Sequence, residues 1–251
     1  MSGHSKWAQI KRQKGVADVK RGQLFTKLGR EILVAAREGG PNPEGNARLR
    51  LAVQRAKEAN MSNDTIERAI KRGSGGSEGV QLEEIQYEGY GPGGAAILVQ
   101  AMTENRNRTV SEVRAAFVRA GGSLGEAGSV AWQFEPRGVI EVELNGSNGD
   151  ELALKAIDAG AQDFHEGDGM LEILTEPTDL DRVRRFLEQE RARVSSAEIN
   201  MIPKAPMQLA ADEAASVLRL VERLEDLDDV QKVYCNLEIS EEALAAYARP
   251  R

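Results

Sequence analysis

The sequence predicts a multidomain α+β protein with a helical N-terminal bundle, a second α+β domain, and a ferredoxin-like third domain inserted into the second. Three observations lead to this fold class. The first ~75 residues show helical periodicity only. A short segment rich in Gly and Ser follows them. Beyond it, strand and helix patterns alternate, and one stretch has the order of a known supersecondary motif.

Residues 1–76 are expected to form three short helices. The first is indicated by four apolar residues at helical spacing, namely Leu24, Leu28, Ile32 and Ala35. It is expected to end at Gly39-Gly40, and a second helix to start at Asn42-Pro43, because proline is favoured in a first helical turn. Ser62 or Asn63 caps a third helix, which Gly73 closes.

The segment from Gly73 to Ser77 is the expected linker, because it has no side chains that could pack into a core. We therefore expect a domain boundary after residue 76. Beyond it, residues 82–88 and 95–102 have the pattern of a strand pair, 109–120 that of a helix and 130–134 that of a strand.

Residues 137–203 have the order β-α-β-β-α-β, which is typical of a ferredoxin-like domain. The expected strands are 139–144, 163–166, 170–174 and 195–202, and the expected helices are 150–159 and 180–190. A last helix at 212–224 and a last strand at 230–239 need partners among the elements of 82–134. The third domain is therefore expected to interrupt a second domain made of 77–136 and 204–251. A single continuous mixed domain is the alternative.

Charge is distributed unevenly along the chain. The net charge is −7, yet residues 1–75 carry 16 Lys and Arg against 7 Asp and Glu, and residues 76–251 carry 17 against 33. A basic region joined to an acidic body is typical of proteins that bind a polyanion. The sequence therefore predicts a nucleic acid, DNA or RNA, as the partner of the N-terminal region.

The candidate nucleic-acid-binding residues are 13 of the 16 Lys and Arg side chains of this region and one tryptophan. They are Lys6, Trp7, Lys11, Arg12, Lys14, Lys20, Arg21, Lys27, Arg30, Arg48, Arg55, Arg68, Lys71 and Arg72. Such cations displace counterions from phosphates, which gives strong, salt-sensitive binding with little sequence preference. The alternative is a solvated basic face, with some cations offsetting helix dipoles. Trp7 either stacks on a base or is buried against the bundle.

Two further segments are candidates for ligand contact. Arg106 and Arg108 precede a predicted helix, where they could hold a second phosphate; capping of that helix by Asn105 or Thr109 is equally compatible with the sequence. The Gly-rich segment 121–129 lacks the lysine of a Walker loop and is expected to be a mobile connection.

No catalytic or metal-binding set is found. One cysteine and two histidines leave too few groups for a zinc site or a catalytic triad. The segment Gly89 to Gly94 fits G-x-G-x-x-G, but a strand rather than a helix follows it. Asp163, His165 and Glu166 cannot share one face of a strand. We expect a non-enzymatic protein without cofactor, metal or small-molecule substrate.

The expected location is the cytoplasm. The single cysteine, Cys235, suits a reducing compartment, and the N-terminal residues resemble neither a signal peptide nor a membrane span. No membrane partner is therefore expected.

Six motifs resemble those of the YebC/PmpR family, which includes the mitochondrial translational activator of cytochrome c oxidase. They are GHSKW at 3–7, FTKLGREI at 25–32, the run from Asn60 to Gly73, YEGYGPGG at 87–94, NRNRT at 105–109 and GGSLGEAGSVAWQF at 121–134. The resemblance covers nearly the whole chain. Departures at Ser62, where proline is usual, and at Gln100, where an acid is common, leave the expected fold unchanged.

The resemblance implies the same three-domain arrangement and a cytoplasmic regulator that binds DNA and controls transcription. Some members of the family act instead on the ribosome during translation, including at proline-rich stretches. The basic first-domain positions of the family correspond to Lys6, Lys11, Arg12, Lys14, Lys20 and Arg21. Two functions therefore remain open: DNA-binding regulator of transcription, and translation factor that binds ribosomal or transfer RNA.

Overall fold

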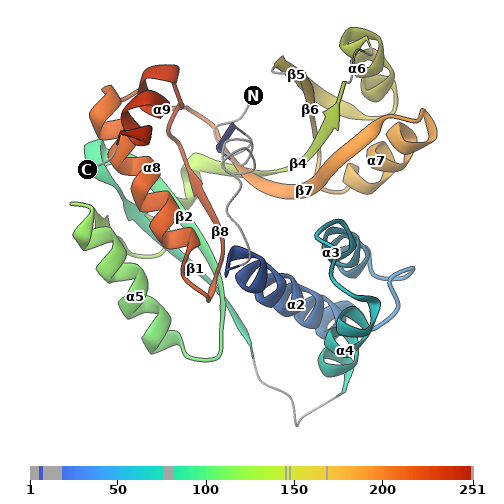
Figure 1. Ribbon diagram of the computed structural model, residues 1–251, viewed down its shortest axis with the longest axis horizontal. Helices are drawn as coiled ribbons and strands as arrows, with labels where there is room; N and C mark the ends of the chain where they lie inside the picture. The colour runs from blue at the N-terminus through green and yellow to red at the C-terminus, as the bar shows by residue number, and fades with distance from the viewer. Residues whose placement is uncertain are drawn as a thin grey trace. The chain divides into compact units, whose positions relative to one another are not determined.

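The computed structural model describes residues 6–7, 19–75, 82–144, 146, 148–167 and 169–249, and of residues 19–21 it describes the backbone alone. Within these ranges the protein is α+β, with eight α-helices and two four-stranded antiparallel sheets (Figure 1). The described chain divides into two compact units. One runs from Glu135 to Ile202, and the other combines the residues before and after it.

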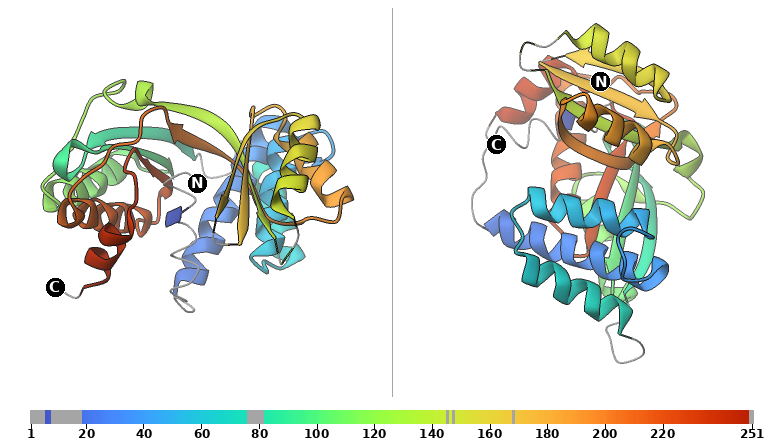
Figure 2. Two further views of the ribbon diagram at one scale, coloured as in Figure 1. Left: turned by 90° about the horizontal axis from the view of Figure 1, so that it is seen from above. Right: turned by 90° about the vertical axis from the view of Figure 1, so that its right-hand side faces the viewer.

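The N-terminal part of the larger unit is a bundle of three helices. Helix α2 (Val19–Gly39) lies between α3 (Ala47–Glu58) and α4 (Asn63–Ser74) (Figure 2). Leu28 and Ile32 of α2 pack with Leu49 of α3 and Ile66 of α4 in one buried cluster. The apolar spacing that predicts these helices is therefore the spacing that forms their core.

Helix α4 crosses α2 closely at Gly73. A Cβ at this position would overlap the carbonyl oxygen of Leu33 and lie 3.0 Å from Cβ of Ala36. We expect Gly73→Ala to lower the free energy of unfolding by about 1–3 kcal/mol, because the helices must move apart. Urea denaturation measures the change. Gly29→Ala in α2 is the control, since a Cβ there meets nothing within 4 Å; a loss of equal size in Gly29→Ala would contradict the packing argument.

The larger unit also contains the first sheet, with strand order β3-β1-β2-β8. Its strands are β1 (Glu83–Tyr90), β2 (Ala96–Thr103), β3 (Ser123–Leu124) and β8 (Val230–Cys235), and its helices are α5 (Arg106–Arg119), α8 (Ala211–Glu225) and α9 (Glu241–Ala248). Residues from β1, β2, β8 and all three helices form a single buried cluster that includes Ile97, Phe117 and Leu218. Strand β8 pairs with β2, so the end of the chain returns to the elements that follow the bundle.

The smaller unit is a second sheet with two helices on one face (Figure 2). Along the chain its elements are β4 (Phe134–Glu143), α6 (Gly149–Asp158), β5 (Ala161–Gly167), β6 (Met170–Thr175), α7 (Leu180–Gln189) and β7 (Arg193–Pro203), and the strand order is β5-β6-β4-β7. Ile140 lies opposite Ile173 in the β4–β6 pair, and both are fully buried.

Two helix starts differ from the sequence prediction. Helix α3 begins at Ala47 and not at Asn42-Pro43, because Asn46 is its N-cap: Oδ1 accepts a hydrogen bond from Leu49 N–H at 3.0 Å. The same side chain donates to the carbonyl of Ala35 at 2.7 Å, which ties α3 to α2. Helix α5 begins at Arg106 and not at Thr109, because Asn105 caps it by accepting from Arg108 N–H.

The strand predicted at 130–134 is wrong. Residues 131–133 form a 3-10 turn, and β4 starts at Phe134. The amides of Val130 and Ala131 bond the carboxylate of Glu88 instead of a neighbouring strand. The last strand ends at Cys235 and not at Ile239, and helix α9, which Ser240 caps, was not predicted.

Candidate nucleic-acid interface

The structure describes nine of the fourteen candidate residues with their side chains. Lys11, Arg12 and Lys14 lie outside the described residues, and of Lys20 and Arg21, in the first turns of α2, only the backbone is described. The nine others fall into three groups: residues bound to the helices and turns around the first sheet, residues that pair with acids of the bundle or of β1, and residues exposed on α4.

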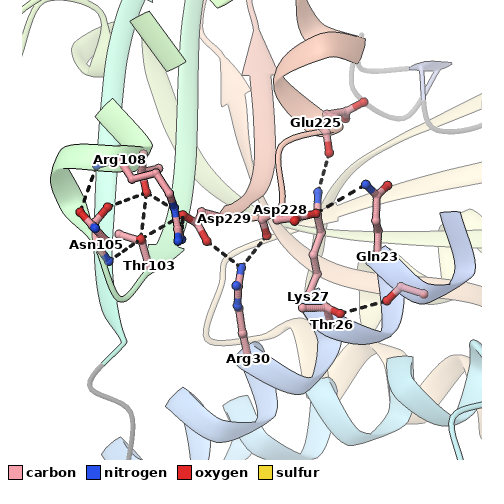
Figure 3. A network of polar contacts seen from close by, with 12 residues as sticks. Gln23, Thr26, Lys27, Arg30, Thr103, Asn105, Arg108, Glu225, Asp228 and Asp229 are labelled. Carbon is pink, nitrogen blue, oxygen red and sulfur yellow. Dashed lines mark hydrogen bonds and ion pairs between the residues drawn. The ribbon is translucent and has the colours of Figure 1, made fainter. Parts of the chain in front are cut away.

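The first group lies on the face of α2 that points toward the turn between α8 and β8 (Figure 3). Lys27 Nζ donates to the carbonyl oxygen of Glu225 at 2.5 Å, and Arg30 donates to that of Asp228 at 2.5 Å. A guanidinium nitrogen of Arg30 also lies 3.1 Å from Oδ1 of Asp229, which makes an ion pair without the geometry of a hydrogen bond. These two cations therefore hold the bundle against the turn between α8 and β8, within the larger unit.

Asp229 joins three elements at this contact. Its side chain is 2% exposed, and its Oδ2 accepts from Arg108 at 2.6 Å, from Thr109 at 2.7 Å and from Thr103 at 3.0 Å. Burial alone would raise the pKa of Asp229, but these hydrogen bonds and the charge of Arg108 outweigh it and lower the pKa. Asp229 is therefore ionised at neutral pH and compensates two arginines.

Lys6 and Trp7 contact the same part of the larger unit, in and next to α8 and α9. Lys6 Nζ donates to the carbonyl of Ile239 at 2.8 Å. The Trp7 indole is 3% exposed, donates to Glu225 Oε2 at 3.0 Å and packs edge-on against Tyr247, with ring centroids 5.3 Å apart. In this arrangement Trp7 has no exposed face on which a base could stack.

The second group, Arg48 and Arg55, forms ion pairs with acids of α2 and β1. Arg48 bonds Glu38 at 2.6 Å and also bonds Glu84 of β1, while Arg55 bonds Glu31 of α2 at 2.7 Å. A phosphate would have to displace these carboxylates before it could take both nitrogens of either guanidinium.

The third group is exposed on the outer face of α4, where Arg68, Lys71 and Arg72 lie within one and a half turns. Arg68 forms an exposed ion pair with Asp64 at 3.0 Å, an interaction that contributes little in water. Lys71 and Arg72 form no ion pair with any acid that the structure describes. These cations are the ones most available to a phosphate.

Two side chains of the NRNRT motif, residues 105–109, already bind other groups of the protein. Asn105 caps α5, and the guanidinium of Arg108 is committed to Asp229, so the cap and an internal ion pair account for most of the motif. Arg106 is exposed in the first turn of α5. The predicted two-arginine phosphate site is therefore reduced to one available side chain.

Sequence reasoning missed Asp229 and its neighbours. The signal was present: residues 225–229 read EDLDD, an acidic run, and Lys27 and Arg30 stand one turn apart in an otherwise mixed helix. Nothing local shows that these two segments, almost 200 residues apart, would meet.

The described residues offer no arrangement suited to metal or nucleophilic chemistry. No group of three or more His, Cys, Asp and Glu side chains within them could hold a metal ion. Burial raises the pKa of the Cys235 thiol to about 11, so very little of the reactive thiolate forms at neutral pH. None of the described helices is both long and apolar enough to cross a membrane.

Two family models match the chain. The model for the TACO1/YebC protein N-terminal domain matches residues 5–76, and the model for the TACO1/YebC second and third domain matches residues 82–237. The chain belongs to the TACO1/YebC family. The resemblance to YebC proteins seen in the sequence is thereby confirmed.

Similar proteins are found over the full length. A probable transcriptional regulatory protein of Dehalococcoides mccartyi (strain CBDB1) is 56% identical over 98% of both chains. One of Pelotomaculum thermopropionicum is 54% identical over 96% of this chain and all of its own. The crystal structure of a conserved hypothetical protein from Aquifex aeolicus, 49% identical, superposes with a TM-score of 0.84 over 90% of this chain and 94% of its own.

Proposed function

We propose that this TACO1/YebC protein is a non-enzymatic, cytoplasmic regulator of transcription that binds the phosphate backbone of duplex DNA through its helical bundle. The exposed cations Arg68, Lys71 and Arg72 carry the proposal, because they lie together on one helix face of a region with 16 basic and 7 acidic residues. The names of the relatives, probable transcriptional regulatory proteins, support the regulatory role.

The binding is expected to depend on charge and DNA shape more than on base sequence. Lys and Arg side chains that meet phosphates fix position without reading bases. Lys11, Arg12, Lys14, Lys20 and Arg21 join the proposed surface on the strength of their charge. Lys27 and Arg30 are assigned instead to the internal contact with Glu225, Asp228 and Asp229.

Reversing the charge of two exposed residues tests this proposal. We expect Lys71→Glu with Arg72→Glu to weaken duplex DNA binding and to reduce the slope of log affinity against log salt by roughly two units, about one for each lost phosphate contact. Fluorescence anisotropy over a salt series measures both quantities.

The matched control is Arg114→Glu with Arg119→Glu, which makes the same change in net charge at two exposed positions of α5. If both double variants weaken binding equally, net charge rather than the α4 surface is responsible. If DNA affinity is unchanged while the Lys71/Arg72 variant leaves the ribosome fraction in sedimentation, the target is ribosomal RNA and the proposal of a transcriptional regulator fails.

We also propose the three-domain division expected from the sequence, with a ferredoxin-like domain at 137–203 inserted into a domain made of 77–136 and 204–251. The unit from Glu135 to Ile202 supports it through its β-α-β-β-α-β order and its sheet order β5-β6-β4-β7. Gly73 and Ser74 belong to α4, so the expected linker is shortened to residues 75–77. Proteolysis there should release a stable larger fragment; cleavage that unfolds the remainder would argue for one continuous domain.

A further inference from the structure

The two tryptophans of the chain lie in opposite environments. Trp7 is 3% exposed, whereas Trp132 is 67% exposed in the 3-10 turn that precedes β4. A large aromatic side chain left in water is a common site of molecular recognition, since its burial by a partner gives a large gain in free energy.

The polar atom of Trp132 is already satisfied within the protein. Its Nε1–H donates to the carbonyl oxygen of Ser129 at 3.1 Å, and the hydroxyl of Tyr90 donates to the same oxygen at 2.9 Å. Tyr90 is 37% exposed, so two partly exposed rings lie beside one carbonyl. What they offer to a partner is the π surface of each ring and not a hydrogen-bond donor.

The turn that carries Trp132 is fixed by a buried carboxylate. Glu88, 4% exposed, accepts hydrogen bonds of 2.7 Å from the amides of Gly128, Val130 and Ala131. The segment 121–129 was expected to be a mobile connection, but Gly128 in it bonds this side chain and Gly125 bonds the backbone carbonyl of Glu88 at 2.7 Å, so both hold it to β1. A ring held in place before binding loses less conformational entropy when it is covered.

A lysine binds the backbone of the residue that carries the exposed ring. Lys204 is exposed, and its Nζ donates to the carbonyl of Trp132 at 2.9 Å while its own amide bonds the carbonyl of Gln133 at 2.8 Å. An ammonium group has three protons, so the bond to this carbonyl leaves others for a second acceptor. An exposed π surface and a cation bound to the backbone of the same residue match a nucleobase and the phosphate attached to it.

We propose that Trp132 and Tyr90 form a stacking site for a base of single-stranded nucleic acid, with the adjacent phosphate held by Lys204. This inference rests on the proposed nucleic-acid binding and extends it to a second surface, outside the bundle. Duplex DNA would use the bundle alone, because its bases are stacked on one another. An unpaired segment would use both surfaces.

Intrinsic fluorescence tests the stacking directly. In Trp7→Phe protein the remaining emission comes from Trp132, and in Trp132→Phe protein it comes from buried Trp7. We expect single-stranded oligonucleotides to quench the Trp7→Phe protein strongly and the Trp132→Phe protein little. An abasic oligonucleotide of the same length should bind without quenching, because it has phosphates but no bases.

Affinity provides the second measurement. Trp132→Ala is expected to weaken binding of the single strand by roughly 5-fold to 100-fold, the range found when one stacking aromatic is removed, and to leave duplex binding unchanged. Trp132→Leu should behave like Trp132→Ala, since leucine has no π face. Both variants should fold normally, because the exposed side chain of Trp132 contributes little to the core. Far-UV circular dichroism checks this.

The outcomes separate the two proposals. If abasic and normal oligonucleotides bind equally and neither quenches Trp132, the stacking site is refuted while phosphate binding by the bundle stands. If no oligonucleotide binds at any salt concentration, both proposals fail. If a proline-rich peptide but no oligonucleotide quenches Trp132, the site formed by Trp132 and Tyr90 binds protein, and its assignment to nucleic acid is overturned.

Discussion

Replacing Asp229 with alanine is expected to lower the free energy of unfolding by about 3–5 kcal/mol, the range for removing one partner from a buried ion pair. The change removes the carboxylate that accepts from the hydroxyls of Thr103 and Thr109 and that pairs with two arginines. It also removes the ion pair between Arg30 of α2 and the turn between α8 and β8. Urea denaturation followed by circular dichroism measures the loss.

The adjacent acid provides the control. Asp228 is exposed, and among the side chains that the structure describes its carboxylate bonds only that of Gln23, at 3.5 Å. Asp228→Ala should therefore change stability by less than ~0.5 kcal/mol, as surface substitutions usually do. Equal losses in the two variants would show that the carboxylate of Asp229 has no special role.

The effect of Asp229 should depend on pH in a defined direction. Its pKa is lowered in the folded protein, so its contribution is complete above the unfolded value of about 3.9 and is lost as the pH falls through the folded value. The difference in stability between wild type and Asp229→Ala should stay constant from neutral pH down to about pH 5 and shrink below about pH 4. A difference that grew on acidification would contradict the lowered pKa.

Elements with a local signal were predictable from the sequence. Helix α2 has its predicted glycine stop, and three of the four apolar residues that predict it, Leu28, Ile32 and Ala35, lie in the buried cluster. The fourth, Leu24, is 43% exposed. The 3-10 turn at 131–133 was mistaken for a strand because its amides are held by Glu88, more than 40 residues away in the sequence. Helix α9 was missed because its apolar residues are mostly small alanines, which give a weak amphipathic pattern.

The candidate interface was predictable as a region but not residue by residue. The surplus of Lys and Arg before residue 76 identifies the basic bundle. It cannot distinguish Arg30, which is committed to Asp229, from Arg72, which is exposed, because both are arginines on amphipathic helices. That distinction depends on which distant carboxylates fold against each helix, and pairing of this kind is not encoded in local spacing.

Glu88 is the second position where a large effect is expected. Glu88→Gln should lower the free energy of unfolding by about 2–4 kcal/mol, because the amide group cannot accept all three backbone hydrogen bonds and places its own N–H donors against one of them. Burial alone would raise the pKa of Glu88, but the bonds from Gly128, Val130 and Ala131 outweigh it and lower the pKa. The stability that the Glu88 carboxylate contributes, relative to Glu88→Gln, should therefore persist above about pH 4.3, the pKa of glutamate in the unfolded chain. It should disappear as the pH falls through the pKa of Glu88 in the folded protein.

The same variant separates stability from recognition. Glu135→Gln is its control, since Glu135 is partly exposed and pairs only with Arg137 two residues away among the described residues. At neutral pH without urea, Glu88→Gln protein should remain folded. The turn that carries Trp132 has then lost part of the hydrogen bonding that fixes it to β1. We expect Trp132 emission to become more accessible to acrylamide and single-strand affinity to fall, with duplex affinity unchanged. Loss of stability with no change at Trp132 would mean that Glu88 supports the fold of the domain but does not orient the exposed ring.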